Sequence, residues 1–300
     1  MNIWKRAVSA AAAAILAIAC CACAPTAPRL SDTILTSPST PSTAPVTEPA
    51  TEPTPPAPQL PPAAEPELPS ILGFLKTAIR PVGSTMYVGG GGWNEADTGA
   101  GIDATTLGIS PQWAQFAAMQ DPSYNYKNHR YQVRDGLDCS GYVGWTVYNT
   151  LETADGRPGY VGPSTTMAKD FAQRGLGTYI PTEELDRWLP GDIMSMQGHV
   201  WIVVGMCSDG SVLLLHASPP GVMFSGTRLP DGSPSQATAL AHQIMEAHFP
   251  DWYSRWPDSA RSHSYLTKSS AMRWTALSDE EGLREMSAEA VVQALFEQVS

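Results

Sequence analysis

The sequence predicts an α+β domain in which a helix carrying a cysteine packs against a central antiparallel β-sheet. Three short, apolar and partly β-branched runs predict the sheet; turn signals separate them, and they lie at residues 193–196, 200–206 and 212–215. Asp138, a typical N-cap, predicts the helix, because apolar residues follow it at helical spacing up to Tyr148. Helices on either side of a strand meander are typical of α+β folds.

The chain is acidic and has enough apolar residues to build a core. It has 300 residues, of which 43% are hydrophobic, and 18 Lys and Arg stand against 29 Asp and Glu, for a formal net charge of −11. Nucleic acid is not an expected partner, because neutralising phosphates needs clustered basic side chains. About 230 residues remain for folding once the leader and spacer described next are set aside, which corresponds to one large domain.

Residues 1–19 have the pattern of an export signal. Two basic residues precede an apolar run, residues 7–19, which is shorter than the roughly 20 residues that span a bilayer. The end of this run, Leu16-Ala17-Ile18-Ala19-Cys20, resembles the lipobox of bacterial lipoproteins, although the usual Leu three places before the cysteine is Ala17. The resemblance implies that Cys20 becomes the lipidated N-terminus. Cys23 is a second choice, and an ordinary cleaved signal is the alternative.

Residues 20–70 are predicted to form a lipidated, disordered spacer. The stretch consists largely of Pro, Thr, Ser and Ala and contains 14 of the 27 prolines of the chain. Such a composition cannot bury a core and favours extended, semi-rigid segments. A lipid at one end of a long tether suits an enzyme that works inside a thick polymer such as a cell wall. A plain flexible linker is the alternative.

The folded domain, residues 71–300, is predicted to begin with two helices and a glycine-rich loop between them. Residues 71–79 are apolar at helical spacing and end before Pro81, and residues 110–119 have a capping Ser followed by Pro. The loop holds four consecutive glycines, Gly89 to Gly92, without a GxxxxGK[ST] or GxGxxG motif, so a nucleotide site is not expected. We expect these glycines to let the backbone pass close to another segment.

Cys139 is the candidate nucleophile of the chain. It is predicted to lie in the first turn of its helix, where free N–H groups and the helix dipole favour the thiolate. Such surroundings can lower a thiol pKa to about 3.5–7.5. The alternative is a small buried residue at the start of a core helix.

His199 and His216 are the candidate partners of Cys139. His199 opens the second strand of the predicted meander and His216 closes the third. Because consecutive strands of a meander run in opposite directions, the two imidazoles can be neighbours despite their separation in sequence. A nucleophile, a general base and a residue that orients the base would then be available.

The C-terminal part is predicted to add two capped helices, at residues 235–247 and 287–296, and a strand at 271–276. Between them, the aromatic cluster at residues 252–256 could line a glycan groove or form a satellite core. One further cysteine and three further histidines lack chemically suitable neighbours in the sequence and are interpreted as structural; they are Cys207, His242, His248 and His263.

Together these residues resemble the NlpC family of papain-like bacterial cell-wall cysteine peptidases. The resemblance covers about half the chain and rests on four pieces in the family's order: Met86-Tyr87-Val88-Gly89-Gly90, Asp138-Cys139-Ser140-Gly141, Gly191-Asp192 followed by Gly198-His199-Val200, and Leu215-His216-Ala217-Ser218. It implies a papain-like fold of the NlpC type. Two stretches, about 95–133 and 227–300, are longer than the family usually has and are expected to be insertions.

The resemblance also implies roles for individual residues. Cys139 would be the nucleophile, His199 the base and His216 the third polar residue, and Tyr87 would donate a hydrogen bond near the oxyanion. Asp138 and Ser140 would help to bind the amine or peptide end of a peptidoglycan stem. No cofactor is expected, and a zinc site is not expected because no HExxH, CxxC or close carboxylate accompanies the two histidines.

The expected function is hydrolysis of an amide bond in peptidoglycan stem peptides, through a thioester intermediate. The resemblance favours the bond from γ-D-glutamate to a diamino acid. The protein is expected to be a monomer outside the bacterial cell membrane, either lipid-anchored or secreted. The alternatives are an N-acetylmuramoyl-L-alanine amidase or an acyltransferase on the same fold, and a non-catalytic wall-binding lipoprotein.

Overall fold

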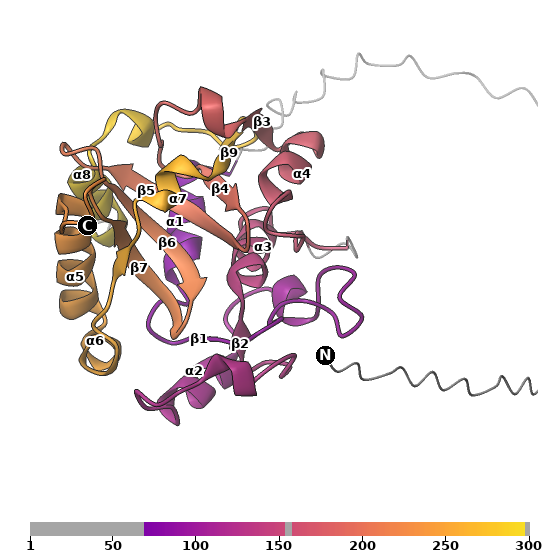
Figure 1. Cartoon of the computed structure of the whole chain (residues 1–300). Helices are drawn as coiled ribbons and strands as arrows, with labels where there is room; N and C mark the ends of the chain where they lie inside the picture. The colour runs from indigo at the N-terminus through magenta and orange to yellow at the C-terminus, as the bar shows by residue number, and fades with distance from the viewer. Residues whose placement is uncertain (1–68, 154–157, 298–300) are drawn as a thin grey trace, which may run out of the picture. The chain divides into compact units, whose positions relative to one another are not determined.

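The protein is α+β, with a mixed central sheet and helices around it (Figure 1). The structure is a computed structural model that describes residues 69–153 and 158–297. The expected leader, Cys20, Cys23 and the spacer up to residue 68 lie outside the described residues.

Nine strands of the described residues form one sheet, in the order β2-β1-β7-β6-β5-β4-β9-β3, with β8 also paired to β7. Their bounds are β1 Met86–Tyr87, β2 Gly136–Leu137, β3 Gly177–Ile180, β4 Ile193–Met196, β5 His199–Met206, β6 Val212–Ser218, β7 Gly221–Thr227, β8 Ala260–Arg261 and β9 Ser270–Trp274. The predicted meander is confirmed, because β4, β5 and β6 pair antiparallel in sequence order.

The expectation of a wholly antiparallel sheet is wrong at two places. The β1–β2 and β7–β8 pairs are parallel, and in each pair one partner has only two residues. Two residues are too few for an alternating pattern to be visible in sequence.

The predicted helices are confirmed, and their bounds differ from the predictions by a residue or two. The helices are α1 Ile71–Ile79, α2 Pro111–Ala118, α3 Cys139–Thr150, α4 Met167–Gln173, α5 Gln236–His248, α6 Pro250–Arg255, α7 Ser264–Thr267 and α8 Ala288–Phe296. Their starts follow the capping signals of the sequence: Ser70, Ser235 and Ser287 each accept a backbone N–H of the first turn of α1, α5 and α8. The short helices α4, α6 and α7 have no counterpart among the predictions.

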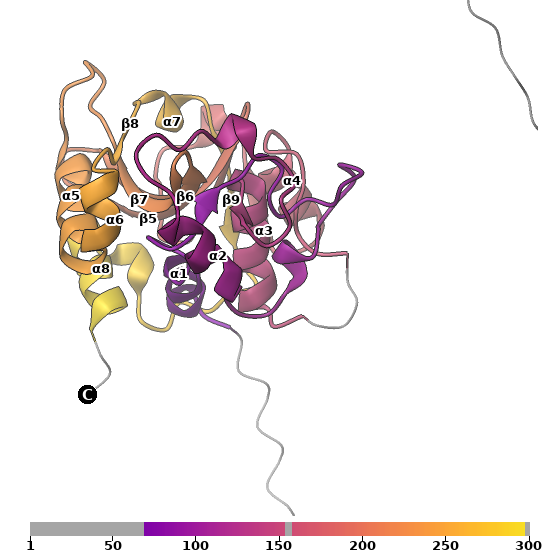
Figure 2. The ribbon, with the colours of Figure 1, turned by 90° about the horizontal axis from the view of Figure 1, so that it is seen from below.

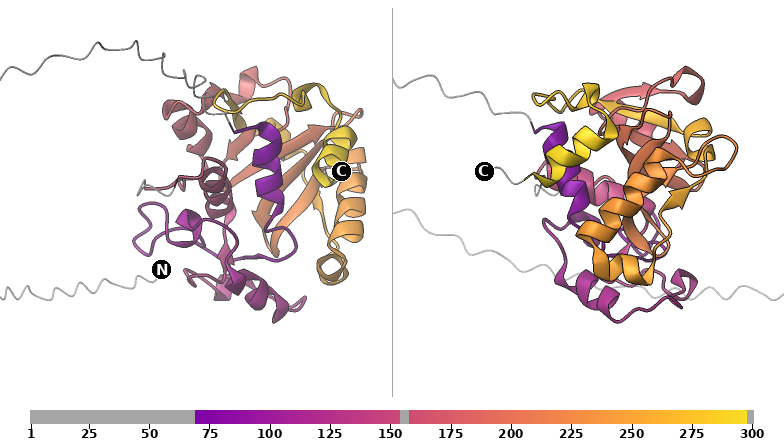
Figure 3. Two further views of the ribbon diagram at one scale, coloured as in Figure 1. Left: turned by 180° about the vertical axis from the view of Figure 1, so that it is seen from behind. Right: turned by 90° about the vertical axis from the view of Figure 1, so that its left-hand side faces the viewer.

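The main core lies between the sheet and the helices α1, α3, α5 and α8. It joins Phe74 of α1, Tyr142 of α3 and Val291 of α8 to inward-facing strand residues such as Ile202 and Leu215. Figure 3 shows α1 and α8 together on the side of the sheet that is turned away from the viewer in Figure 1. The helices that position the cysteine therefore share one core with the strands that carry the histidines.

The opposite face of the sheet has a smaller hydrophobic cluster. Trp201 and Leu214 form its centre, and α7 packs against them through Leu266 and Tyr265. Figure 1 shows α7 in front of the sheet, and Figure 2 shows it on the far side of the sheet from α1. A short segment, rather than a layer of long helices, therefore covers this face.

The stretch 227–300 contributes directly to the sheet and the core. Strand β9 lies between β4 and β3, and α5 and α8 belong to the main core. Of the aromatic cluster in α6, Trp252 is 1% and Trp256 9% exposed, and both are part of the core. The core interpretation of this cluster is thus confirmed, and a glycan groove on these two indoles is wrong.

The glycine loop passes close to α3, as its composition predicts. Gly92 has φ of +90°, and a Cβ built on it would lie 2.5 Å from the Cα of Gly141. A Cβ on Gly91 would lie 2.5 Å from the carbonyl oxygen of Gly136. Backbone therefore packs on backbone here, which any side chain would prevent.

An ion pair between buried Asp192 and partly exposed Arg273 connects the start of β4 to β9. Arg273 donates to the carboxylate of Asp192, with 2.8 Å between Nη2 and Oδ2, and Asp192 also accepts the backbone N–H of Leu189. Burial raises the pKa of Asp192, and the interaction with Arg273 offsets this only in part. The pair fixes the Gly191-Asp192 turn just ahead of the strands that carry the site.

Among residues 69–153 and 158–297, no helix is long and apolar enough to cross a membrane.

Candidate active site

The start of α3 is held by the strand before it. β2 pairs with β1 in parallel, so that Tyr87 and Leu137 are register partners. Asp138 then caps the helix: its Oδ1 accepts the backbone N–H of Gly141 at 2.7 Å. As a result Cys139, the first residue of α3, lies beside Tyr87.

Cys139 is 6% exposed, and its sulfur has polar neighbours from two other elements. The backbone N–H of Val200 in β5 and the hydroxyl of Tyr87 in β1 both lie near the thiol. Burial raises the pKa of the Cys139 thiol to about 12, and the neighbouring Asp138 adds to this effect. The lowered thiol pKa that the helix start predicts is therefore wrong for the structure at rest, because desolvation outweighs the helix dipole.

Tyr87 keeps its proton next to the sulfur. Burial is the largest cause of a raised pKa for its phenol, followed by the charges of Cys139 and Asp138. Its ring packs edge-on against Tyr126, with 5.2 Å between the centroids. A protonated, fixed hydroxyl beside the sulfur can donate a hydrogen bond to an oxygen that becomes negative there.

His199 and His216 are directly hydrogen-bonded. His199 begins β5, as expected, but His216 lies inside β6, which continues to Ser218, so the prediction that it closes this strand is wrong. Nε2 of His199 and Nδ1 of His216 are 2.8 Å apart. The neighbourhood expected from the meander is thus confirmed. Because Nε2 of His199 faces His216, Nδ1 is the nitrogen of His199 that remains for the nucleophile.

Both imidazoles are kept neutral by their surroundings. Burial lowers the pKa of His199 to about 3, and the positive charge of Arg261 adds to this effect. His216 is completely buried, and burial followed by Arg261 holds its pKa well below the ordinary value. A neutral histidine is the form that can accept a proton.

Asp138 and Ser140 have their polar atoms engaged within the fold. Ser140 Oγ donates to Asp138 Oδ1 at 2.9 Å and accepts from Trp93 Nε1 at 2.7 Å. The two residues are 8% and 4% exposed, and burial raises the pKa of Asp138 to about 6. Both side chains hold the first turn of α3, and their expected role in binding an amine stays a prediction.

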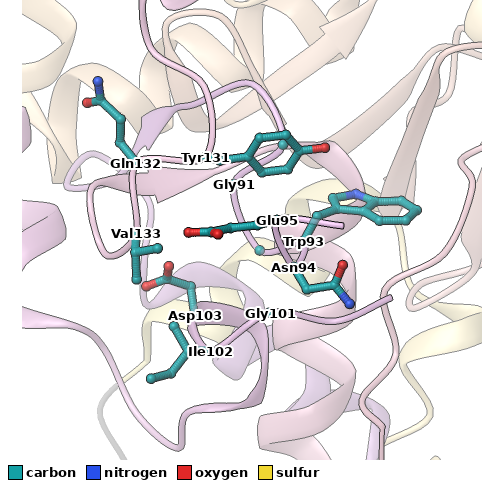
Figure 4. Close-up of a pocket in the computed structure, with 12 residues that line it drawn as sticks. Gly91, Trp93, Asn94, Glu95, Gly101, Ile102, Asp103, Tyr131, Gln132 and Val133 are labelled. Atoms are coloured by element: carbon teal, nitrogen blue, oxygen red, sulfur yellow. The ribbon is translucent and has the colours of Figure 1, made fainter. Parts of the chain in front are cut away.

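A hollow of about 180 Å³ lies next to this turn, and its lining includes Trp93 (Figure 4). Gly91 and Gly92 form its wall on the side of α3. Figure 4 shows the carboxylate of Glu95 between Tyr131 and Asp103, within the hollow. The hollow thus combines aromatic surface with carboxylates, and the Trp93–Ser140 hydrogen bond connects it to the residue that follows the cysteine.

Three residues of the site were not found by sequence reasoning. Ser225 of β7 and Arg261 of β8 both contact Nε2 of His216, at 3.0 Å and 3.2 Å. Tyr265 of α7 lies over the pair, with 5.3 Å between its ring centroid and that of His199. No spacing rule connects these residues to the histidines, because β8 has only two residues and α7 four.

Of the residues interpreted as structural, Cys207, His242 and His248 pack elsewhere in the fold. Cys207 is 2% exposed, His242 contacts the Tyr253 hydroxyl, and His248 stacks on Phe296 at 3.9 Å between centroids. His263 precedes α7 as its N-cap residue. In the part of the chain that the structure describes, no group of three or more Cys, His, Asp and Glu side chains could hold a metal ion.

Comparisons with protein-family models, with curated proteins and with solved structures found no match for this chain. The function of the protein is therefore inferred from the residues of the site.

Proposed function

We propose that the protein is a papain-like cysteine peptidase of the NlpC type, which hydrolyses an amide bond in the stem peptides of peptidoglycan. The bond from γ-D-glutamate to a diamino acid is the proposed target. The carrying observation is two pairs of groups: Tyr87 of β1 lies beside Cys139 of α3, and His199 of β5 is hydrogen-bonded to His216 of β6. The backbone N–H of Val200, the residue that follows His199, lies near the Cys139 thiol and connects the two pairs. A lone buried cysteine at a helix start would not need such neighbours.

The groups suffice for acyl transfer through sulfur. His199 accepts the thiol proton through Nδ1, and the Cys139 sulfur attacks the carbonyl carbon. The N–H groups at the start of α3 and the Tyr87 hydroxyl stabilise the oxyanion. His199 then gives the proton to the leaving amine, and in the second half it takes a proton from the water that hydrolyses the thioester. His216 orients His199 throughout.

The decisive experiment is digestion of defined muropeptides followed by fragment-mass analysis. The wild-type protein should release fragments cut within the stem peptide, and Cys139→Ala should release none. Cys207→Ala is the matched control, because it removes the other buried thiol of the described residues and should keep the activity. Wild-type turnover by Cys139→Ala would rule out the cysteine mechanism.

The same masses separate the alternatives. Release of intact stem peptides from the glycan would show an amidase, and addition of the acyl group to an added amine would show a transferase. Binding to sacculi without any fragment, together with an unreactive Cys139, would indicate a wall-binding protein without catalysis.

We also propose that Cys20 anchors the protein to the outer face of the membrane. Expression in a bacterium that processes lipoproteins should place the wild type in the membrane fraction, and Cys20→Ala should yield an uncleaved precursor or a released protein. Cys23→Ala is the control, because Cys23 is the less favoured acceptor. If mature Cys20→Ala were still bound to the membrane, the anchor would have to be assigned to Cys23, or the lipid anchor would have to be rejected.

A further inference from the structure

Nε2 of His216 has two neighbours that favour opposite protonation states of this nitrogen. The Arg261 Nε–H points at this nitrogen from 3.2 Å, and the Ser225 hydroxyl lies 3.0 Å from it. A guanidinium can only donate, whereas a hydroxyl can donate or accept. The neighbour that His216 engages therefore decides whether Nε2 carries a proton.

The contact with Arg261 fixes one arrangement of protons. Nε2 of His216 must be unprotonated to accept from Arg261, so neutral His216 carries its proton on Nδ1. That proton is donated to Nε2 of His199, 2.8 Å away. Neutral His199 then has its own proton on Nδ1, and it has no lone pair left with which to accept the thiol proton of Cys139.

The contact with Ser225 permits the opposite arrangement. If Ser225 accepts, His216 carries its proton on Nε2 and accepts at Nδ1 from Nε2–H of His199. Nδ1 of His199 is then free to take the thiol proton. In the exchange His216 passes its Nδ1 proton to His199, His199 releases one proton to water, and water supplies one to Nε2 of His216, so the number of protons is unchanged.

We propose that Arg261 is a positioning residue that holds His216 in the tautomer protonated at Nδ1, and that the base function of His199 requires Arg261 to move away so that Ser225 accepts instead. This inference rests on the proposed function, because it describes how the same pair of histidines is switched. Arg261 would thus keep the nucleophile in its neutral, inactive form until a substrate or partner displaces it.

The surroundings of Arg261 suit such a movable contact. It lies at the end of the two-residue strand β8, and its side chain is 12% exposed. Its other partners are the carbonyl oxygen of Ala260, the sulfur of Met223 and, at 3.8 Å, the carboxylate of Asp258, which is 81% exposed. No buried carboxylate holds the guanidinium in place among the described residues.

Few other ionisable groups face the histidine pair. Tyr265 of α7 packs against both imidazoles, and the Cys139 thiol lies near Tyr265. Burial raises the pKa of the Tyr265 phenol, so it stays neutral. Arg261 is therefore the permanent charge next to His216. Burial is the largest cause of the lowered pKa of both imidazoles, and the positive charge of Arg261 is the second.

The tautomer can be measured directly, without any substrate. Long-range ¹H–¹⁵N spectra of protein labelled with ¹⁵N-histidine distinguish Nδ1–H from Nε2–H, and His216→Asn assigns the signals of His216. The wild type should show His216 protonated at Nδ1, and Arg261→Met should show it protonated at Nε2. A wild-type His216 protonated at Nε2, or an unchanged tautomer in Arg261→Met, would overturn the proposal.

Thiol reactivity gives a second readout. Alkylation of Cys139 by iodoacetamide at pH 7, followed by peptide mass analysis, should be at least tenfold faster in Arg261→Met, because a fall of one unit in the thiol pKa gives tenfold more thiolate. Cys207 is the internal control, since a loosened fold would expose both thiols. Arg255→Met is the matched variant, because Arg255 contacts the carbonyls of Ala117 and Gln120 instead of a histidine.

The outcomes separate this inference from the proposed function. A tautomer change in Arg261→Met without hydrolysis of any muropeptide would support the switch and reject the substrate. Hydrolysis by the wild type with His216 already protonated at Nε2 would support the peptidase and reject the switch. Equal acceleration of Cys139 and Cys207 would show loosening and would also reject the switch.

Discussion

Gly92 is the residue at which a single methyl group tests the packing of the site. Gly92→Ala should destabilise the fold for two reasons. The φ of +90° strains the backbone of an alanine, and the added methyl group would clash with the Cα of Gly141. Gly175→Ala is the matched control, because Gly175 has φ of +80° with nothing within 4 Å of its Cβ position. The control should lose about 1–2 kcal/mol of unfolding free energy from backbone strain.

Gly92→Ala should lose about 1–3 kcal/mol more than Gly175→Ala, since the clash with α3 adds an overpacking cost. It should also slow alkylation or turnover at Cys139, which the control should not change. Urea unfolding and the Cys139 reaction rate measure the two effects. Equal losses in both variants would mean that the loop can move away from α3.

His216 should make the fold sensitive to acid. Its pKa in the fold lies well below the ordinary 6.5, so the unfolded chain binds more protons and stability falls as the pH drops below about 6.5. His216→Asn keeps a side-chain donor and removes this group. Relative to wild type, the variant should gain about 2 kcal/mol between pH 7 and pH 5. A constant difference in urea-unfolding free energy across that range would contradict the assignment.

At the residue scale, the proposed reacting groups could be predicted from the sequence, whereas the residues that contact His216 and control its tautomer could not. Cys139, His199 and His216 could be found because a helix cap and the apolar runs of two neighbouring strands are visible in the sequence. Arg261, Ser225 and Tyr265 could not, because the pairing of β7 with β6 and β8 and the packing of α7 bring them to His216. The thiol pKa was also beyond prediction, since it depends on burial.

At the scale of elements, the Asp192–Arg273 pair should matter more than an exposed ion pair, because both Nε and Nη2 of Arg273 donate to a buried carboxylate. Arg273→Ala would leave the carboxylate of Asp192, which is 1% exposed, without its counter-charge. Breaking a buried pair in this way costs about 3–5 kcal/mol. Thermal or urea unfolding should show this loss, together with weakened pairing of β4 with β9.

The control for this variant is Arg130→Ala. Arg130 and Asp97 also form an ion pair, at 3.0 Å, but their side chains are 63% and 55% exposed. Water screens such a pair, so its loss should cost less than about 1 kcal/mol. Similar losses for both variants would mean that Asp192 protonates instead of remaining as an unpaired charge.

Long elements could be predicted and short ones could not. The helices at 71–79 and 235–248 and the strands β4 to β6 show enough residues to display their period and caps. Strands β2 and β8 have two residues each, and α7 has four, so their existence depends on the neighbours against which they pack. The direction of the two parallel pairs was missed for the same reason.

At the scale of the whole molecule, the site should form and disappear together with the core. Its groups come from β1, α3, β5, β6 and β8, and one hydrophobic cluster joins α3 to β5 and β6. In a urea series, we expect the exposure of Cys139, the exposure of Cys207 and the loss of the far-ultraviolet circular dichroism signal to have the same midpoint. Pulsed alkylation with mass analysis measures the two thiols separately. Exposure of Cys139 at lower urea than Cys207 would show that the α3 start opens by itself.

The short strands also affect how the molecule behaves at high concentration. Strand β7 has β6 along one side, and on the other side β1 pairs at Gly221 while β8 pairs at Gly226 and Thr227. The backbone groups of Val222 are taken by Thr85 and Gly83. A free strand edge is where two chains join and aggregate. By covering both ends of this edge, two strands of two residues each leave β7 little free edge at which a second copy could pair.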